Sequence, residues 1–279
     1  MSGFSADWLA LREPVDHRSR NAQVCAAMLA HLGALAQPRL IDLGCGSGSN
    51  LRALAPLLPQ RQSWRLVDAD PLLLAAAHEA LQDWAQSSRN EGDVLHLTYA
   101  DKEIEVRFDQ VDLSRDLERV LDQGADLITA AAFFDLVAPD WLNRFCAALI
   151  ARKLPFYTVL TYDGVEQWSP PHSADAQVLA AFHAHQASDK GFGPAAGPRA
   201  TALMEAQFKS AGWHVMTGDS AWKMTAAQDA KLISALAQGA AQAVAETGRV
   251  ALADLQSWLQ ARTQAERASI GHLDLFARP

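Results

Sequence analysis

The chain has 279 residues, of which 49% are hydrophobic and 20% are charged, and its formal net charge is −8 at pH 7. This size suffices for one large domain with insertions, so we expect residues 1–279 to form a single domain. The negative charge opposes contact with a polyanion and argues against a nucleic-acid partner. No run of eighteen apolar residues is present, so we expect no membrane span.

The N-terminal residues are too polar for a secretory signal, because Asp7, Arg12 and Glu13 stand where such a signal needs an apolar run. The three cysteines are widely spaced, which predicts reduced thiols rather than a disulfide framework or a cysteine metal site. Together these features predict a cytoplasmic protein.

Short β-like runs alternate with helical stretches over the first 162 residues. This alternation predicts an α/β domain with a mostly parallel sheet. The predicted strands are Arg39–Asp42, Trp64–Asp68, Ile104–Phe108, Asp126–Ala130 and Pro155–Tyr162. Apolar residues at helical spacing predict helices at Asn50–Leu58, Leu72–Ser87, Ser114–Leu121 and Pro139–Arg152.

The rhythm changes after residue 162. Residues 163–200 are rich in Pro, Gly and His and predict an insertion over the sheet edge, with one helix around Asp175–Ala187. A helix near Thr201–Ala211 and a strand near Trp213–Thr217 follow, and the last strand is expected in "IGHLDLFARP".

Residues 225–268 are alanine-rich and predict a pair of helices, at about Ala226–Glu246 and Val250–Ala268, before the last strand. We expect this pair to cover the sheet. A wall of the substrate pocket or the face of a homodimer is the alternative.

The run "RLIDLGCGSGSN" places Gly44, Gly46 and Gly48 between a strand and a helix, where bare backbone lets N–H groups approach a ligand. The spacing departs from the dinucleotide fingerprint G-x-G-x-x-G, because Leu51 stands at the third glycine position. Asp42 would also lie near phosphate oxygens. A cationic or neutral ligand fits better, and a nicotinamide oxidoreductase is disfavoured.

Asp68 ends the second strand in "RLVDADP", twenty residues beyond Gly48. A carboxylate at this place can accept both hydroxyl protons of a ribose, which indicates a nucleoside ligand. Asp70 is the rival candidate, but it precedes Pro71 and is typical of the residue that caps the next helix.

"LIDLGCGSGSN" followed by "LVDADP" resembles the first two motifs of the class I S-adenosylmethionine-dependent methyltransferases. The resemblance implies a Rossmann-like, doubly wound, mostly parallel seven-stranded sheet with an antiparallel last strand and helical insertions. It also implies S-adenosylmethionine as the cofactor. Asp42 and the glycines Gly44, Gly46 and Gly48 would then line the methionine moiety, and Asp68 would hold the ribose.

The resemblance implies further contacts after the third and fourth strands. In "FDQVDLS", Asp112 is expected near the adenine amino group, with a helix cap as its alternative and Asp109 as the weaker candidate. Backbone carbonyls around Ala130 are expected to receive the cofactor ammonium. Phe133 and Phe134 would flank adenine or substrate, or at least one of them belongs to the core.

Residues 1–36 are expected to form an N-terminal helical lid, as the corresponding segment does in many proteins of this family. Within it, Arg20 either reaches the cofactor carboxylate or pairs with Asp16 along a helix.

Methyl transfer from a sulfonium is an in-line displacement, so catalysis is mostly positioning and desolvation. The candidate general bases are His183 and His185 in the insertion, joined there by His172 and Asp189, together with Asp135 after the fourth strand and Tyr162 and Asp163 after the fifth. The two histidines begin "FHAHQASDKGFGPAAGPRA", a segment that could fold back over the substrate or simply be a polar connection. Residues two apart on a helix face different ways, so we expect no metal site.

The region after the fourth strand reads TAAAF, at Thr129–Phe133, and lacks the Asn/Asp-Pro-Pro-aromatic motif of nucleobase methylating relatives. The sequence therefore predicts a methyltransferase that acts on an oxygen or nitrogen of a small-molecule acceptor by in-line transfer. The alternative is a non-catalytic S-adenosylmethionine-binding protein with a regulatory or scaffold role.

Overall fold

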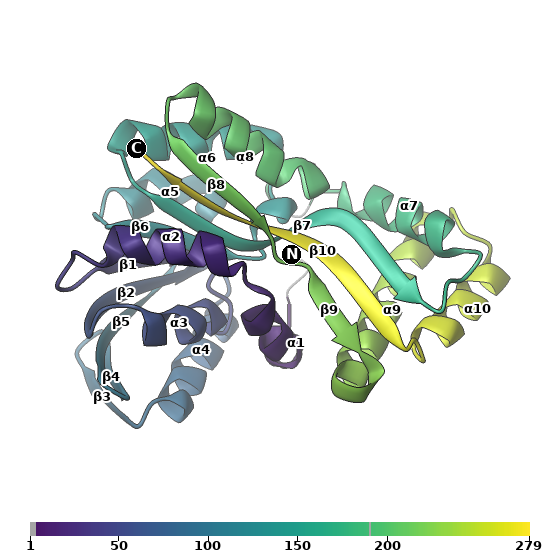
Figure 1. Ribbon diagram of the computed structural model, residues 1–279, viewed down its shortest axis with the longest axis horizontal. Coiled ribbons are helices and arrows are strands. Elements are labelled where there is room, and N and C mark those ends of the chain that lie inside the picture. The colour runs from purple at the N-terminus through teal and green to yellow at the C-terminus, as the bar shows by residue number, and fades with distance from the viewer. Residues whose placement is uncertain (1–3, 190) are drawn as a thin grey trace.

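A twisted β-sheet forms the centre of the computed structural model, which describes residues 4–189 and 191–279 (Figure 1). Five parallel strands make its middle: β1 (Arg39–Leu43), β2 (Arg61–Asp68), β5 (Lys102–Gln110), β6 (Leu127–Ala131) and β7 (Phe156–Ser169). Five further strands pair antiparallel: β3 (Ser87–Glu91), β4 (Val94–Tyr99), β8 (His214–Asp219), β9 (Trp222–Thr225) and β10 (Arg267–Arg278).

The strands lie in the order β3-β4-β5-β2-β1-β6-β7-β10-β8, with β9 paired to β10. The predicted α/β class, the parallel core of the sheet and the antiparallel last strand are confirmed, and the antiparallel strands on both sides of the core make the whole sheet mixed. The sheet in the described residues has ten strands rather than seven, because β3, β4 and β9 add to it. β3 was not predicted, because all five of its residues are exposed and carry no apolar alternation.

Ten α-helices are present in the described ranges. They are α1 (Ala6–Ser19), α2 (Ala22–Leu32), α3 (Ser49–Leu54), α4 (Pro71–Trp84), α5 (Leu113–Leu121), α6 (Pro139–Arg152), α7 (Asp175–Gln186), α8 (Ala200–Ser210), α9 (Ala226–Thr247) and α10 (Leu252–Arg262). Three short 3-10 helices are η1 (Ala55–Leu57), η2 (Phe134–Leu136) and η3 (Gly197–Arg199). The predicted helix at Asn50–Leu58 is therefore α3 followed by η1.

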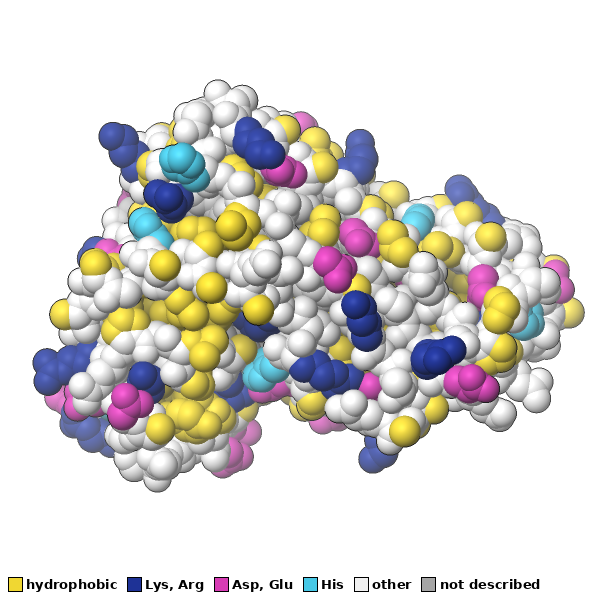
Figure 2. All heavy atoms as spheres, viewed as in Figure 1, with side chains coloured by type: hydrophobic (Ala, Val, Ile, Leu, Met, Phe, Trp, Pro, Cys, Tyr) yellow, Lys and Arg dark blue, Asp and Glu magenta, His cyan; other side chains and the backbone are white. Residues whose placement is uncertain are grey.

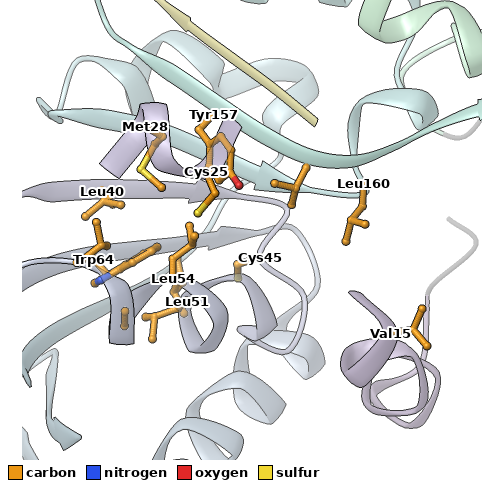
Figure 3. Close-up of a cluster of buried hydrophobic side chains, with 14 of the residues drawn as sticks. Val15, Cys25, Met28, Leu40, Cys45, Leu51, Leu54, Trp64, Tyr157 and Leu160 are labelled. Atoms are coloured by element: carbon orange, nitrogen blue, oxygen red, sulfur yellow. The ribbon is translucent and has the colours of Figure 1, made fainter. Parts of the chain in front are cut away.

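Side chains of the central strands are buried on both faces of the sheet, as expected for parallel strands covered by helices. In β1, Leu40 packs with α2, α3 and α4 on one face. Its neighbours Ile41 and Leu43 pack with α5, α6 and α8 on the other. Figure 3 shows Met28 and Cys25 of α2 pointing toward Leu40 and the other side chains of the first cluster.

A third cluster of buried side chains joins α7, α9 and α10, and it surrounds Trp258. It lies beside the extended ends of β7 and β10, at the right of Figure 1. The predicted insertion at 163–200 therefore begins inside a strand, because β7 continues to Ser169. The last predicted helix also ends earlier, at Arg262, because Arg267 and Ala268 pair with Ser169 and Trp168 in the ladder.

None of the helices in the described ranges is long and apolar enough to cross a membrane.

Candidate functional site

The turn that leaves β1 has a backbone that favours glycine at three positions. Gly44, Gly46 and Gly48 have φ angles of 62°, 53° and 78°. A Cβ atom at Gly44 would lie 2.6 Å from Cδ2 of Phe133, and one at Gly46 would lie 2.9 Å from Cδ1 of Leu9. The turn thus has bare backbone, which two apolar side chains cover, Phe133 from the segment after β6 and Leu9 from α1.

Asp68 lies at the carboxyl end of β2 and holds this turn in place. Its Oδ2 accepts a hydrogen bond of 2.9 Å from the N–H of Gly46, and its Oδ1 accepts one of 3.0 Å from the N–H of Asp70. Burial raises the pKa of the Asp68 carboxyl. Asp70 caps α4 by accepting 2.8 Å from the N–H of Leu72, which confirms the capping role predicted for it.

Asp42 lies beneath the turn rather than at its surface, since it is fully buried. Its Oδ1 accepts a hydrogen bond of 2.7 Å from Nδ2 of Asn50, while its Oδ2 has no partner among the described residues. Burial raises the pKa of Asp42 to about 7. A direct contact of Asp42 with the methionine moiety stays a prediction, and in the structure Asp42 is covered by the turn.

Asn50 is a member of this network that the sequence reasoning missed. It donates also to Oγ1 of Thr129 at 3.1 Å, and its Oδ1 accepts 2.9 Å from Nη1 of Arg20. Arg20 is thereby joined to Asp42 through one amide. Its alternative partner Asp16 is instead bound by Arg12, with Nε to Oδ2 at 2.8 Å.

Two further residues expected near the cofactor, Asp112 and Ala130, make other contacts in the structure. Asp112 is the N-cap of α5, where its Oδ1 accepts 2.9 Å from the N–H of Ser114, as its alternative interpretation held. Ala130 is fully buried within β6 and pairs with Thr158 of β7. A contact of either residue with adenine or with the ammonium group stays a prediction.

The segment after β6 divides into core and site. Phe134 is fully buried against Phe145 and Phe156, so at least one of the two phenylalanines belongs to the core. Phe133 is half-buried and lies against Gly44. Asp135 follows in η2, with its Oδ1 buried and without a hydrogen-bond partner among the described residues. Burial raises the pKa of Asp135 to about 6.

His183 and His185 point to different surroundings. Nε2 of His183 lies 3.0 Å from the hydroxyl of Tyr162, which donates to Oε1 of Glu166 at 2.9 Å. Burial lowers the pKa of His183 and raises that of Glu166. His185 instead lies 3.0 Å from Oε2 of Glu246, on α9. The structure brings His183 into a polar cluster with Tyr162 and leaves His185 outside it.

The same cluster contains aromatic residues that the sequence analysis did not select. The ring of His272 lies 6.1 Å from that of Tyr162 and 4.9 Å from that of Trp222. The guanidinium of Arg12 lies 4.9 Å from the centroid of Trp222. His272 and Trp222 come from strands far along the chain, so the pairing of β10 with β7 and β9 was needed to find them.

Helix α1 connects this polar cluster to the glycine turn. Leu9 lies over Gly46, while Arg12, one turn later, contacts Trp222. Glu13 binds Arg52 of α3, with Nε to Oε1 at 2.8 Å, and His17 lies 3.0 Å from Oγ of Ser49. These contacts hold α1 over the carboxyl ends of the central strands. The lid function predicted for residues 1–36 stays a prediction.

Among residues 4–189 and 191–279, no group of three or more His, Cys, Asp and Glu side chains lies together in a way that could hold a metal ion.

Comparisons with known proteins identify the fold of the chain. No family model and no curated protein matches the chain. Solved structures do match over nearly its whole length. A cyclopropane-fatty-acyl-phospholipid synthase-like protein from Lactobacillus casei has 15% identity and a TM-score of 0.51, covering 95% of this chain and 98% of its own. The cyclopropane synthase MmaA2 from Mycobacterium tuberculosis has 15% identity and a TM-score of 0.50, covering 99% and 95%.

The mycolic acid cyclopropane synthase CmaA1, complexed with SAH and CTAB, has 12% identity and a TM-score of 0.51, covering 92% of this chain and 83% of its own. The fold is that of the class I S-adenosylmethionine-dependent methyltransferases. The fold predicted from the glycine turn and the acid of the second strand is thereby confirmed. At these identities the likeness concerns the fold.

The residues present fit S-adenosylmethionine. The turn between β1 and α3 is a cradle that a Cβ atom would fill at Gly44 and Gly46. Asp68, partly exposed beside it, can accept hydrogen bonds from ribose hydroxyls. The carboxyls near the turn suit a cationic ligand better than a phosphate. Leu9 and Phe133 cover the cradle with side chains that can change rotamer.

Proposed function

We propose that the chain is an S-adenosylmethionine-dependent methyltransferase that acts on an oxygen or nitrogen atom of a small molecule. The observation that carries this proposal is the bond between Asp68 and Gly46. It fixes a carboxylate at the end of β2 beside a bare glycine turn at the end of β1. The neighbouring ends of these parallel strands form the place where ligands bind in open α/β sheets.

In this proposal Gly44, Gly46 and Gly48 pass under the methionine part of the donor, and Asp68 holds its ribose. When bound, S-adenosylmethionine supplies an electrophilic methyl group on a sulfonium. Asp42 supports the turn through Asn50 and contributes negative charge beneath it. Phe133 and Leu9 would move from the glycine faces and pack against the donor, which keeps water from the reacting atoms.

Asp135 is the group that we assign to the proton of the acceptor. It follows Phe133 by two residues, and its buried Oδ1 has no hydrogen-bond partner among the described residues, so it can accept one from an acceptor hydroxyl or amine. Because burial raises the pKa of Asp135 to about 6, its carboxylate is a stronger base than an exposed one and is still ionised at pH 7.

We assign His183 as a second candidate for the proton of the acceptor, and its ring lies beside Tyr162. Burial lowers the pKa of His183, so its imidazole is neutral at pH 7 and can accept a proton. Tyr162 fixes the ring through the contact of 3.0 Å at Nε2. His185 has no part in this arrangement, because its ring lies beside Glu246 on α9.

A small acceptor is supported by the way the site is covered. Phe133 meets Phe192 at 5.7 Å between ring centroids, and the N–H of Ala196 donates 2.7 Å to the carbonyl of Val137. Residues that follow α7 therefore pack on the segment after β6. With α1 on the other side, these contacts cover the site, which favours a small acceptor over a folded macromolecule.

The experiment measures ligand binding first and turnover second. Calorimetry with S-adenosylmethionine and with NADH on the purified chain should give binding of the methyl donor and none of NADH. Incubation with the donor and a panel of phenols, carboxylic acids and amines should then release S-adenosylhomocysteine. Donor binding without product for any acceptor class would favour the non-catalytic regulatory or scaffold protein, and absence of donor binding would refute both.

A further inference from the structure

A cavity of about 440 Å³ lies between α2 and α3, outside the face of the turn that Leu9 and Phe133 cover. Its long walls are apolar and come from Ala22, Ala26, Leu29, Ala53 and Leu57. Figure 2 shows hydrophobic side chains gathered over α2 and α3 on this face of the molecule. The volume falls within the range of small-molecule sites, roughly 300–1,000 Å³.

One end of the cavity carries the basic residues His17, Arg20 and Arg52, of which His17 has its pKa lowered by burial. Arg52 has its donors occupied, since Nε and Nη2 bind Glu13 and Nη1 donates 2.7 Å to the carbonyl of Ser47. Arg20 differs. Its Nη1 donates to Asn50, but its Nε is buried and has no hydrogen-bond partner among the described residues. A buried N–H group without a partner is unfavourable, and an anion at this end would satisfy it.

The charge around Arg20 favours an anion as well. The carboxyls that interact with its charge are those of Asp42 and Asp274, which are both fully buried. Burial raises the pKa of Asp42 to about 7, so at pH 7 this carboxyl compensates the guanidinium only in part. Glu13 is engaged by Arg52. The cavity therefore combines a guanidinium that has one buried N–H group without a partner among the described residues with an apolar channel lined by Ala26, Leu29, Ala53 and Leu57.

We propose that this cavity binds a single-chain amphiphile with a carboxylate head, which pairs with Arg20 while the alkyl chain lies between α2 and α3. The chain would contact Ala26 and Leu29 on one side and Ala53 and Leu57 on the other. Leu57 is 54% exposed, so a bound chain would also cover a large apolar side chain that now faces solvent. The proposed ligand is distinct from the methyl donor and from its acceptor, although Arg20 is also joined to Asp42 through Asn50.

Decanoate is the probe, because it joins a carboxylate to a chain of suitable length. Calorimetry with the purified chain should show decanoate binding at least ten-fold tighter than acetate, which lacks the chain, and than decanol, which lacks the charge. Arg20→Gln should weaken decanoate binding by about ten-fold to a hundred-fold, the effect of losing a charged hydrogen-bond partner. The same variant should leave decanol binding within about two-fold, because decanol does not use the charge.

Variants at exposed alanines of α2 test the channel. Ala26→Trp should remove decanoate binding by filling the channel, whereas Ala30→Trp, one turn farther along the exposed side of α2, should leave it unchanged. Circular dichroism should show both variants folded. Alanine-methyl NMR should place the shifts caused by decanoate at Ala26 and Ala53.

Equal decanoate affinity in wild type, Arg20→Gln and Ala26→Trp would overturn the proposal, as would shifts confined to alanines outside the cavity. Cosedimentation with phosphatidylglycerol vesicles without binding of decanoate would do the same, because it would assign the patch to a lipid surface.

Discussion

The Oδ2 atom of Asp68 accepts a hydrogen bond of 2.9 Å from the N–H of Gly46, and this contact joins the end of β2 to the turn that leaves β1. A second bond runs the same way, from the N–H of Cys45 to the carbonyl of Val67 at 3.0 Å. The turn is therefore positioned by the neighbouring strand as well as by its own glycines. A ligand on the turn is then necessarily beside the Asp68 carboxylate.

Asp68→Ala tests this placement. We expect it to weaken methyl-donor binding by about 1–3 kcal/mol, because a charged hydrogen-bond acceptor is lost at the ribose and the turn loses its anchor at Gly46. Calorimetry measures the affinity. Asp70→Ala is the matched control: it removes the cap of α4 and should lower the free energy of unfolding by about 0.5–2 kcal/mol with donor affinity unchanged. Equal donor affinity in wild type and Asp68→Ala would refute the assignment.

Asp135→Asn should stabilise the protein at high pH. Burial raises the pKa of Asp135 to about 6, above its unfolded value, so the folded state loses stability as the pH rises from about 4 to 6. Asparagine cannot ionise and avoids this loss. We expect urea unfolding at pH 8 to give the variant a free energy of unfolding about 1–3 kcal/mol higher than that of wild type. Near pH 4 the two free energies should match.

Asp126→Asn is the control of opposite sign. Burial raises the pKa of Asp126, but hydrogen bonds and the charge of Arg39 outweigh burial and leave the pKa lowered. Its contribution to stability is present at neutral pH and lost on acidification, so this variant should be less stable than wild type at pH 8. An Asp135→Asn variant that gains nothing at pH 8, or gains as much at pH 4, would contradict burial as the cause.

Tyr162→Phe tests the polar cluster around His183. Removing the hydroxyl leaves Oε1 of Glu166 and Nε2 of His183 without their shared partner in a buried place, which should lower the free energy of unfolding by about 1–3 kcal/mol. The pKa of His183, followed by NMR, should also change. Tyr157→Phe is the matched control. The buried Tyr157 hydroxyl lies beside the Cys25 thiol, a weak hydrogen-bonding group, so its removal should lower the free energy of unfolding by less. Equal losses in both variants would contradict a special role for the Tyr162 hydroxyl.

Local sequence patterns predicted the helices and strands whose formation depends mainly on their own residues. The helix predicted at Pro139–Arg152 has those bounds in the structure, because Pro139 suits its first position and its apolar residues recur at helical spacing. β1 and β2 were predicted because each contains a short apolar run that a turn follows. β3, β4 and β9 were missed. β3 has no apolar residue, and β9 has four residues whose pairing partner lies about forty positions later.

The candidate site divides in the same way. Asp68 and the glycines lie at strand ends, so their proximity follows from the order of neighbouring parallel strands. Tyr162 and His183 meet because α7 returns onto β7, which no local pattern indicates. The network around the buried Asp42 was also beyond reach, since Asn50 of α3 donates to Asp42 and itself accepts from Arg20, which follows α1. Sequence reasoning therefore brought together the residues of the glycine turn and the end of β2, but it did not bring together those around His183.

Glu13→Ala tests the attachment of α1 to the glycine turn. The side chains of Glu13 and Arg52 are 19% and 8% exposed, and their pair joins α1 to α3 beside Ser47. Burial raises the pKa of Glu13, but the hydrogen bond and charge of Arg52 outweigh it and leave the pKa lowered. A lowered pKa means stability that is present at neutral pH and lost as the pH falls through it. We expect Glu13→Ala to lower the free energy of unfolding by about 1–3 kcal/mol at pH 7 and by less near pH 4.

Hydrogen exchange should show where the loss acts: amides of α1 should exchange faster in Glu13→Ala while those of β1 keep their protection. The comparison variant is Glu246→Ala, which breaks the exposed pair with His185 and should change stability by less than about 1 kcal/mol. If the amides of α1 and β1 accelerate equally, α1 unfolds together with the sheet, and its opening over Gly46 as a separate lid is excluded.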